Sequence, residues 1–159
     1  MSTPAGPLQA GLAQLAAAGR LRQRREVASR ALDGTRVRVS DVTELRDAIV
    51  IASRTAISRD QFAPYEGWFK KIEPVGSIAW KLACIAAGQG DLNVSVAPKN
   101  EWDVCAGDVL VREAGGIYVG FDGSKRVYNQ AKTLIEAGMA AGSPALVHAF
   151  LGRDRARET

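Results

Sequence analysis

The stretch NEWDVCAGDVLVREAGG, residues 100–116, decides the fold of this chain. Its apolar spacing predicts a tightly packed helix from Trp102 to Ala114 that stops at a pair of glycines. Asp103 lies in the first turn of this helix. An acidic residue there can accept a hydrogen bond from Asn100 in a capping box, and its charge suits the positive end of the helix dipole. This capping role is a structural explanation for an acidic residue at position 103.

A second helix is predicted from Ser77 to Ala87, directly after Gly76. Ser77 is a good N-cap residue, apolar residues recur after it at helical spacing, and Gly88 stands where a left-handed C-terminal cap is needed.

Extended segments alternate with these helices. Residues 48–52 form the continuous apolar run AIVIA, which is typical of a strand covered on both faces. A final helix has Pro144 in its first turn and is expected to end near Leu151. The alternation predicts an α/β fold, a layered sandwich in which helices flank a mixed β-sheet. The remaining predicted strands are residues 35–40, 72–75, 91–96, 117–119 and 134–141.

The segment 59–71 is rich in aromatic residues. The spacing of Phe62, Tyr65 and Phe69 places three rings on one helical face. We expect these rings to pack against the sheet, and the alternative is an aromatic wall that stacks on a ligand ring.

The basic character of the chain is concentrated at its beginning. The formal net charge is +4; residues 1–30 hold five arginines and one glutamate, whereas residues 31–159 carry equal numbers of basic and acidic side chains. We therefore expect an Arg-rich leader at residues 1–30, extended or helical and poorly packed, then a domain at residues 31–152 and a charged tail at residues 153–159. Because the leader lacks interleaved aromatic residues, nucleic acid is not an expected partner.

The length and hydropathy are those of one globular domain. The chain has 159 residues, of which 47% are hydrophobic, enough to form a core. No apolar run approaches the roughly 20 residues that span a bilayer. The positive charges follow the alanine-rich residues 11–19 instead of preceding them, unlike a secretory signal. We expect a soluble, cytoplasmic protein with no membrane partner.

Several motifs follow one another in a fixed order along the chain. They are the Leu32-Asp33-Gly34 turn with its VRVS strand, the apolar strand at residues 48–52, Gly76-Ser77 at a helix start, Trp102-Asp103 followed by small residues, and EAGG at residues 113–116. This series covers about residues 32–151. It resembles the C-terminal half of the inositol monophosphatase superfamily, which includes the 3'(2'),5'-bisphosphate nucleotidases.

The resemblance implies magnesium-dependent hydrolysis of a phosphate monoester. The substrate would be a phosphorylated small molecule: an inositol phosphate, a sugar phosphate or a 3'(2'),5'-bisphosphate nucleotide. By the same resemblance, Asp103 would be a ligand of Mg²⁺, and Gly76 and Ser77 would line the substrate pocket. Trp102 is expected to be a packing residue.

The other carboxylates of such a site are missing from the sequence. Magnesium prefers about six oxygen ligands, and the family draws most of its acidic ligands from a Gly-Glu segment and an Asp-Pro-x-Asp-Gly-Thr segment, neither of which this chain contains. Residues 32–35 imitate the end of the second segment, but Arg30 and Ala31 stand where Asp and Pro should be. We therefore expect no catalytic residue in this chain.

Two interpretations follow. In the first, the chain is the C-terminal portion of a phosphatase and is inactive or weakly active alone. Either it is a shortened gene product or it works with a separately supplied N-terminal half, and its expected protein partners are that half or a second copy in a homodimer. In the second, it is a non-catalytic interaction or regulatory protein that retains the fold. An apolar face left uncovered by the missing half would favour self-association or a partner in either case.

Overall fold

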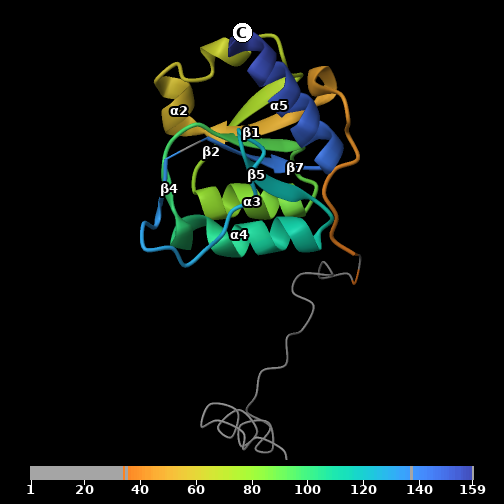
Figure 1. Cartoon of the computed structure of the whole chain (residues 1–159). Coiled ribbons are helices and arrows are strands. Elements are labelled where there is room, and N and C mark those ends of the chain that lie inside the picture. The colour runs from red at the N-terminus through yellow and green to blue at the C-terminus, as the bar shows by residue number, and fades with distance from the viewer. Residues whose placement is uncertain (1–33, 35, 137, 159) are drawn as a thin grey trace, which may run out of the picture.

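The computed structural model describes residues 34, 36–136 and 138–158, and the predicted leader lies outside them. These residues form three layers (Figure 1). A five-stranded sheet occupies the middle, α3 and α4 cover one of its faces, and α5 covers the other. The strands of the sheet are β1 (Ile49–Ser53), β2 (Lys71–Val75), β3 (Leu92–Ser95), β5 (Ile117–Gly120) and β7 (Met139–Gly142).

The remaining elements connect or cover this sheet. A small second sheet pairs β4 with β6. The helices are α2 (Arg54–Ser58), α3 (Ile78–Ala86), α4 (Glu101–Glu113) and α5 (Pro144–Glu158), with short 3₁₀ turns at Leu45–Asp47 and Ala63–Tyr65, and the two strands of the second sheet are β4 (Lys99–Asn100) and β6 (Leu134–Ile135). This arrangement confirms the predicted α/β sandwich with a mixed sheet.

The strand order β2-β1-β3-β7-β5 determines which edge of the sheet is suited to bind a ligand. β2, β1 and β3 are parallel, and β7 is antiparallel to both β3 and β5. β5 therefore runs in the same direction as β1. The carboxyl ends of β1, β2, β3 and β5 consequently lie on one edge of the sheet, the position at which open α/β sheets bind ligands.

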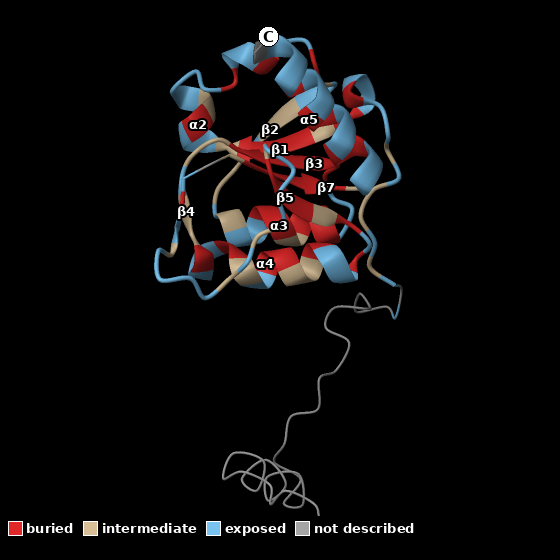
Figure 2. Cartoon of the chain, viewed as in Figure 1, coloured by how far each residue is buried: buried red, intermediate tan, exposed pale blue. Residues whose placement is uncertain are grey.

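The parallel strands are held in register by buried polar side chains. Asp91 accepts a 2.6 Å hydrogen bond from the backbone N–H of Ile49, and the Asn93 amide donates to the Ile51 carbonyl at 2.6 Å. Both contacts join the start of β3 to β1. Asp91 thus has a structural role at the centre of the sheet, where the strands are almost entirely buried (Figure 2).

The helices α3 and α4 lie side by side and run in the same direction. Each one connects two strands that point the same way, so each returns antiparallel to the strands and starts at their carboxyl edge. The helices approach closely at Gly107, where a Cβ atom would lie 2.5 Å from Cδ1 and 2.7 Å from Cβ of Leu82. The absence of a side chain at Gly107 therefore permits this packing.

The opposite face of the sheet is covered by an aromatic cluster. The Phe150 ring of α5 contacts Tyr65 at 5.5 Å and Trp68 at 6.2 Å between ring centroids. Phe62 and Tyr65 are buried. The rings of the segment 59–71 therefore pack against the sheet and α5, as expected, and do not form an open wall for a ligand.

Three predicted elements differ from the observed ones. The predicted strand 134–141 is two strands, β6 and β7, which belong to different sheets. Residues 37–40 form no strand, because the Val39 N–H donates to the carbonyl of Ala114 at the end of α4 and pairs with no neighbouring strand. The final helix continues past Leu151 to Glu158, because Asp154 is buried and pairs with Arg157 at 3.3 Å along the helix. None of the described helices is long and apolar enough to cross a membrane.

The contact at Gly107 gives a stability test. We expect Gly107→Ala to lower the free energy of unfolding by about 1–3 kcal/mol, because the Cβ of Leu82 cannot rotate away from the added methyl group. Gly152→Ala in α5 is the matched control; a Cβ there meets nothing within 4 Å. It should raise stability by up to about 1 kcal/mol through helix propensity. Urea denaturation of both variants provides the measurement, and equal responses would contradict the packing.

Candidate functional site

The starts of α3 and α4 form the candidate site at the carboxyl edge of the sheet (Figure 1). The first backbone N–H groups of a helix have no acceptor within the helix, and they carry the positive end of its dipole. Two such ends side by side favour a negatively charged ligand. The sequence-predicted residues Gly76, Ser77 and Asp103 all lie at these two helix starts.

Asp103 occupies the first turn of α4 and is exposed. Its Oδ2 accepts a hydrogen bond from the Asn100 N–H at 3.1 Å, so the capping role predicted for it is present. Its carboxylate acts electrostatically on Lys99. Burial holds the pKa of Lys99 below its ordinary value, and the negative charge of Asp103 opposes this shift.

Ser77 and Gly76 shape the start of α3. The Oγ of Ser77 accepts from the Trp80 N–H at 3.3 Å. Ser77 has φ 60° and ψ 122°, a conformation that costs a residue other than glycine about 1–3 kcal/mol and that is found most often at functional sites. At Gly76, a Cβ atom would lie 2.5 Å from Nη2 of Arg54. Gly76 thus allows the Arg54 guanidinium to lie against the start of the helix.

Lys81 is a buried cation one helical turn after Ser77. Its residue is 3% exposed. Within the described residues the Lys81 Nζ is not among the fully buried atoms that lack a hydrogen-bond partner, so the ammonium reaches solvent while its aliphatic stem is buried. Burial, with a smaller contribution from the positive charge of Lys99, lowers the pKa of Lys81 from 10.5 to about 8.

Sequence reasoning missed Lys81 and Arg54. The signal for Lys81 was available, because it lies on the same helical face as Ile78, Leu82 and Ile85, where a charge is out of place. For Arg54, the only sequence signal for a place near the site was its position directly after the buried strand β1.

A loop beside the site is fixed to the start of α4 through Glu101. One carboxylate oxygen accepts from Arg126 at 2.9 Å, and the other accepts from the backbone N–H groups of Asn129 at 2.7 Å and Gln130 at 3.3 Å. Although burial opposes it, these hydrogen bonds hold the pKa of Glu101 below its ordinary value. Further along α4, Asp108 accepts from the Tyr128 hydroxyl at 2.8 Å. The loop is thus anchored twice to one helix.

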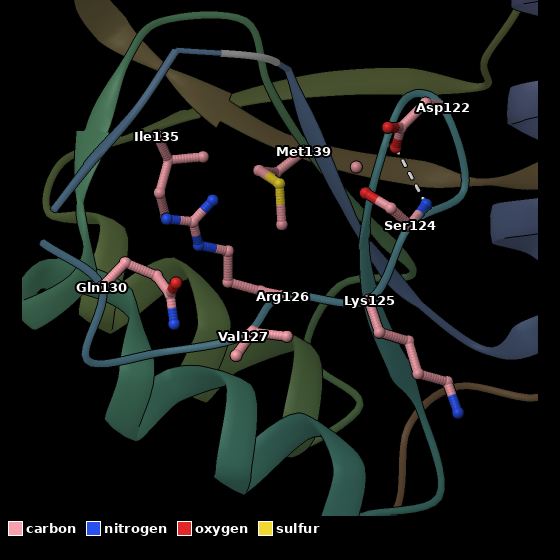
Figure 3. A pocket seen from close by; sticks show the side chains of 9 residues that line it. Asp122, Ser124, Lys125, Arg126, Val127, Gln130, Ile135 and Met139 are labelled. Atoms are coloured by element: carbon pink, nitrogen blue, oxygen red, sulfur yellow. Dashed lines mark hydrogen bonds between the residues drawn. The ribbon is translucent and has the colours of Figure 1, made fainter. Parts of the chain in front are cut away.

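This loop encloses a cavity of about 260 Å³ (Figure 3). Figure 3 shows the Arg126 side chain extending toward Ile135, whereas Lys125 points away. Asp103, Gly76 and Ser77 are not part of its lining, although Glu101 at the start of α4 bonds the lining residues Arg126 and Gln130. The lining residues are Gly120, Asp122, Ser124, Lys125, Arg126, Val127, Gln130, Ile135 and Met139.

The described residues do not fit a magnesium ion by themselves. Within residues 34, 36–136 and 138–158 there is no group of three or more His, Cys, Asp or Glu side chains that could hold a metal ion. Magnesium needs about six oxygen ligands. Asp103 offers one carboxylate, and Lys99 lies close to it. Any metal at Asp103 would require ligands from outside the described residues.

The layered α/β fold and its paired helix starts define an α/β protein whose candidate site lies at the carboxyl edge of the sheet. The inositol monophosphatase family model matches residues 9–152. This chain belongs to the inositol monophosphatase family. The match begins at residue 9, inside the segment expected to be a leader.

Individual relatives agree with this assignment. The Nus factor SuhB of Escherichia coli K12 is 32% identical over 134 residues, which cover 78% of this chain and 46% of the relative. A fructose-1,6-bisphosphatase/inositol-1-monophosphatase of Thermotoga maritima is 30% identical over 101 residues, covering 58% of this chain and 36% of the relative. The chain thus spans about half the length, or less, of these curated relatives.

Solved structures show the same fold. An IMPase from Thermotoga maritima superposes with a TM-score of 0.61 at 26% identity, covering 76% of this chain and 45% of that one. The SuhB protein of Bartonella henselae superposes with a TM-score of 0.61 at 24% identity, covering 80% of this chain and 49% of that one.

The lowered pKa of Lys81 makes a prediction about stability. Lys81→Met should raise the free energy of unfolding at pH 7 by about 2 kcal/mol, because the folded state disfavours the charged ammonium. The wild-type chain should become more stable between pH 8 and pH 10.5, where its unfolded state binds more protons than its folded state. The advantage of the variant should therefore shrink over that interval.

Thermal or urea unfolding across this pH range measures the effect. Lys70→Met, at an exposed lysine, is the control and should change stability by less than about 0.5 kcal/mol at every pH. A loss of stability in Lys81→Met at pH 7 would mean that the ammonium has a partner.

Proposed function

We propose that this chain supplies one side of a site for magnesium-dependent hydrolysis of a phosphate monoester. Asp103 contributes a carboxylate to the metal, and Gly76 and Ser77 line the position of the phosphate at the start of α3. The observation that carries the proposal is the meeting of Asp103 and the start of α3 at one sheet edge, in a chain of the inositol monophosphatase family. When bound, magnesium would supply charge neutralisation and an activated water.

The proposal includes the need for further carboxylates. Since one carboxylate cannot hold magnesium, we infer that the chain alone is inactive or weakly active, and that a complementary N-terminal half or a second copy completes the site. The substrate class is a phosphorylated small molecule: an inositol phosphate, a sugar phosphate or a 3'(2'),5'-bisphosphate nucleotide. The printed activities of the Thermotoga maritima relative, on fructose 1,6-bisphosphate and inositol 1-monophosphate, support the sugar and inositol members of this class.

Two exposed tryptophans support the need for a covering partner. Trp80 of α3 is 59% exposed and Trp102 of α4 is 66% exposed. The expectation that Trp102 packs within this chain was wrong, because most of its side chain is exposed. Large aromatic residues on adjacent helix starts are typical of a surface that another polypeptide buries.

A non-catalytic role is the second candidate. The same tryptophans fit a protein that keeps the fold in order to bind a partner, and the SuhB relatives are named as Nus factors, not by an enzymatic activity. In this case the addition of missing carboxylates would restore no turnover.

Complementation distinguishes the two candidates. We expect the purified chain with Mg²⁺ to hydrolyse inositol 1-phosphate and fructose 1,6-bisphosphate very slowly or not at all. Adding the separately expressed N-terminal part of the Thermotoga maritima relative, the part that precedes the matched segment, should restore phosphate release. Asp103→Asn should then lose at least about 100-fold of this activity, because it removes a metal ligand.

Glu113→Gln is the matched control, since Glu113 is an exposed carboxylate at the far end of α4. It should leave the restored activity within about twofold of wild type, as expected for a surface substitution away from the site. Rapid turnover by the chain alone that survives Asp103→Ala would refute the proposed role of Asp103. Failure of complementation would favour the non-catalytic candidate.

A further inference from the structure

The cavity beneath the loop that follows β5 contains a buried donor without an acceptor. Arg126 extends among the lining residues of this cavity, and its Nη2 donates to Glu101 at 2.9 Å (Figure 3). The Nε of the same guanidinium is buried, and among the described residues it has no hydrogen-bond partner. A buried charged donor without an acceptor is costly, and such a group commonly marks the place of a ligand, an ion or a water.

A second buried polar atom without a partner lies behind the same wall. Tyr118 of β5 is 2% exposed, and its hydroxyl oxygen has no hydrogen-bond partner within the described residues. Its ring belongs to one hydrophobic cluster with Ile135 and Met139, which line the cavity. Burial raises the pKa of Tyr118, and the charge of Arg126 opposes this shift, so the hydroxyl and the guanidinium are near each other. Two of the three such atoms in the described part of the chain thus gather here.

The cavity combines the unpaired donor with apolar surface. An apolar wall is formed by Val127, Ile135 and Met139. The carboxylate of the lining is engaged elsewhere, because Asp122 accepts from the Ser124 N–H at 2.8 Å, and Figure 3 shows this pair on the other side of Met139 from the guanidinium. The cavity therefore offers a ligand one cationic end and one apolar end.

The size and charge of the cavity favour a small carboxylate. Sites for drug-sized ligands have volumes of roughly 300–1,000 Å³, so a cavity of about 260 Å³ suits a smaller molecule. A guanidinium binds carboxylates and phosphates through charge-assisted hydrogen bonds. Glu101 already pairs with Arg126, and Asp122 adds a negative charge to the lining. A monoanion therefore fits the charge balance better than a phosphate dianion.

We propose that this cavity is a binding site for a small monocarboxylate with an apolar body. The carboxylate accepts from the Arg126 Nε–H, and the body of the ligand lies against the apolar wall. None of Gly76, Ser77 and Asp103 lines the cavity, so this proposal does not depend on the proposed function.

Titration of the ¹⁵N-labelled full chain with sodium benzoate tests the proposal. Benzoate joins a carboxylate to an apolar ring, and benzyl alcohol has nearly the same shape without the charge. We expect saturable chemical-shift changes at the amides of residues 120–136 with benzoate, at a Kd of about 1 mM for a ligand of this size. Benzyl alcohol should bind at least about tenfold more weakly, because it cannot form the charge-assisted hydrogen bond.

Two variants with the same change of charge separate the Arg126 donor from net charge. Arg126→Gln should weaken benzoate binding at least about tenfold, because it removes the charged donor. Lys125 is exposed and its side chain points away from the cavity. Lys125→Gln should therefore bind benzoate within about twofold of wild type, since solvent and salt screen an exposed charge. Urea unfolding checks the fold of Arg126→Gln, which also loses its ion pair with Glu101.

Val127→Trp provides a second test that holds even if Arg126→Gln does not fold. Val127 is 67% exposed, so a larger side chain fits there without disturbing the core. It should narrow the cavity and weaken benzoate binding several-fold.

Four results would overturn the proposal. They are absence of saturable benzoate binding, binding of benzyl alcohol or inorganic phosphate as tight as that of benzoate, equal loss of binding in Lys125→Gln and Arg126→Gln, and undiminished binding in Val127→Trp.

Discussion

The close parallel packing of α3 against α4 is the constraint on which the rest of the structure depends. Gly107 lets the two helices meet at Leu82 without an intervening side chain. Because both helices follow strands that run the same way, this contact brings both amino-terminal ends to one edge of the sheet. Gly76, Ser77 and Asp103 lie at that edge because they belong to the starts of these two helices. The position of the site therefore depends on the helix pair and on strand direction more than on any single motif.

The set of carboxylates at this edge limits what the described residues can bind. A magnesium site needs about six oxygen ligands, and the described residues provide Asp103 without a cluster of further acidic side chains. Membership of the inositol monophosphatase family accounts for the scaffold that places Asp103 there.

Local sequence signals predicted the central elements well. The caps at Ser77 and Asn100 and the apolar run at residues 48–52 located α3, α4 and β1 within about two residues. The alternating pattern of residues 35–40 predicted a strand that the structure does not contain. Alternation indicates burial on one side, but it does not say whether a neighbouring strand is available, and the Val39 N–H bonds to the end of α4. Asp103 followed from a motif, whereas the burial of Lys81 follows from the packing of α3 against its neighbours, which no local sequence signal records.

The protonation of Lys81 tests the central claim most directly. Lysine labelled with ¹³C at Cε permits the titration of Lys81 to be followed by NMR in the full chain, with assignment by comparison with Lys81→Met. Burial of the side chain predicts a Lys81 pKa near 8 in the folded protein. A Lys81 pKa near 10.5 would contradict the account.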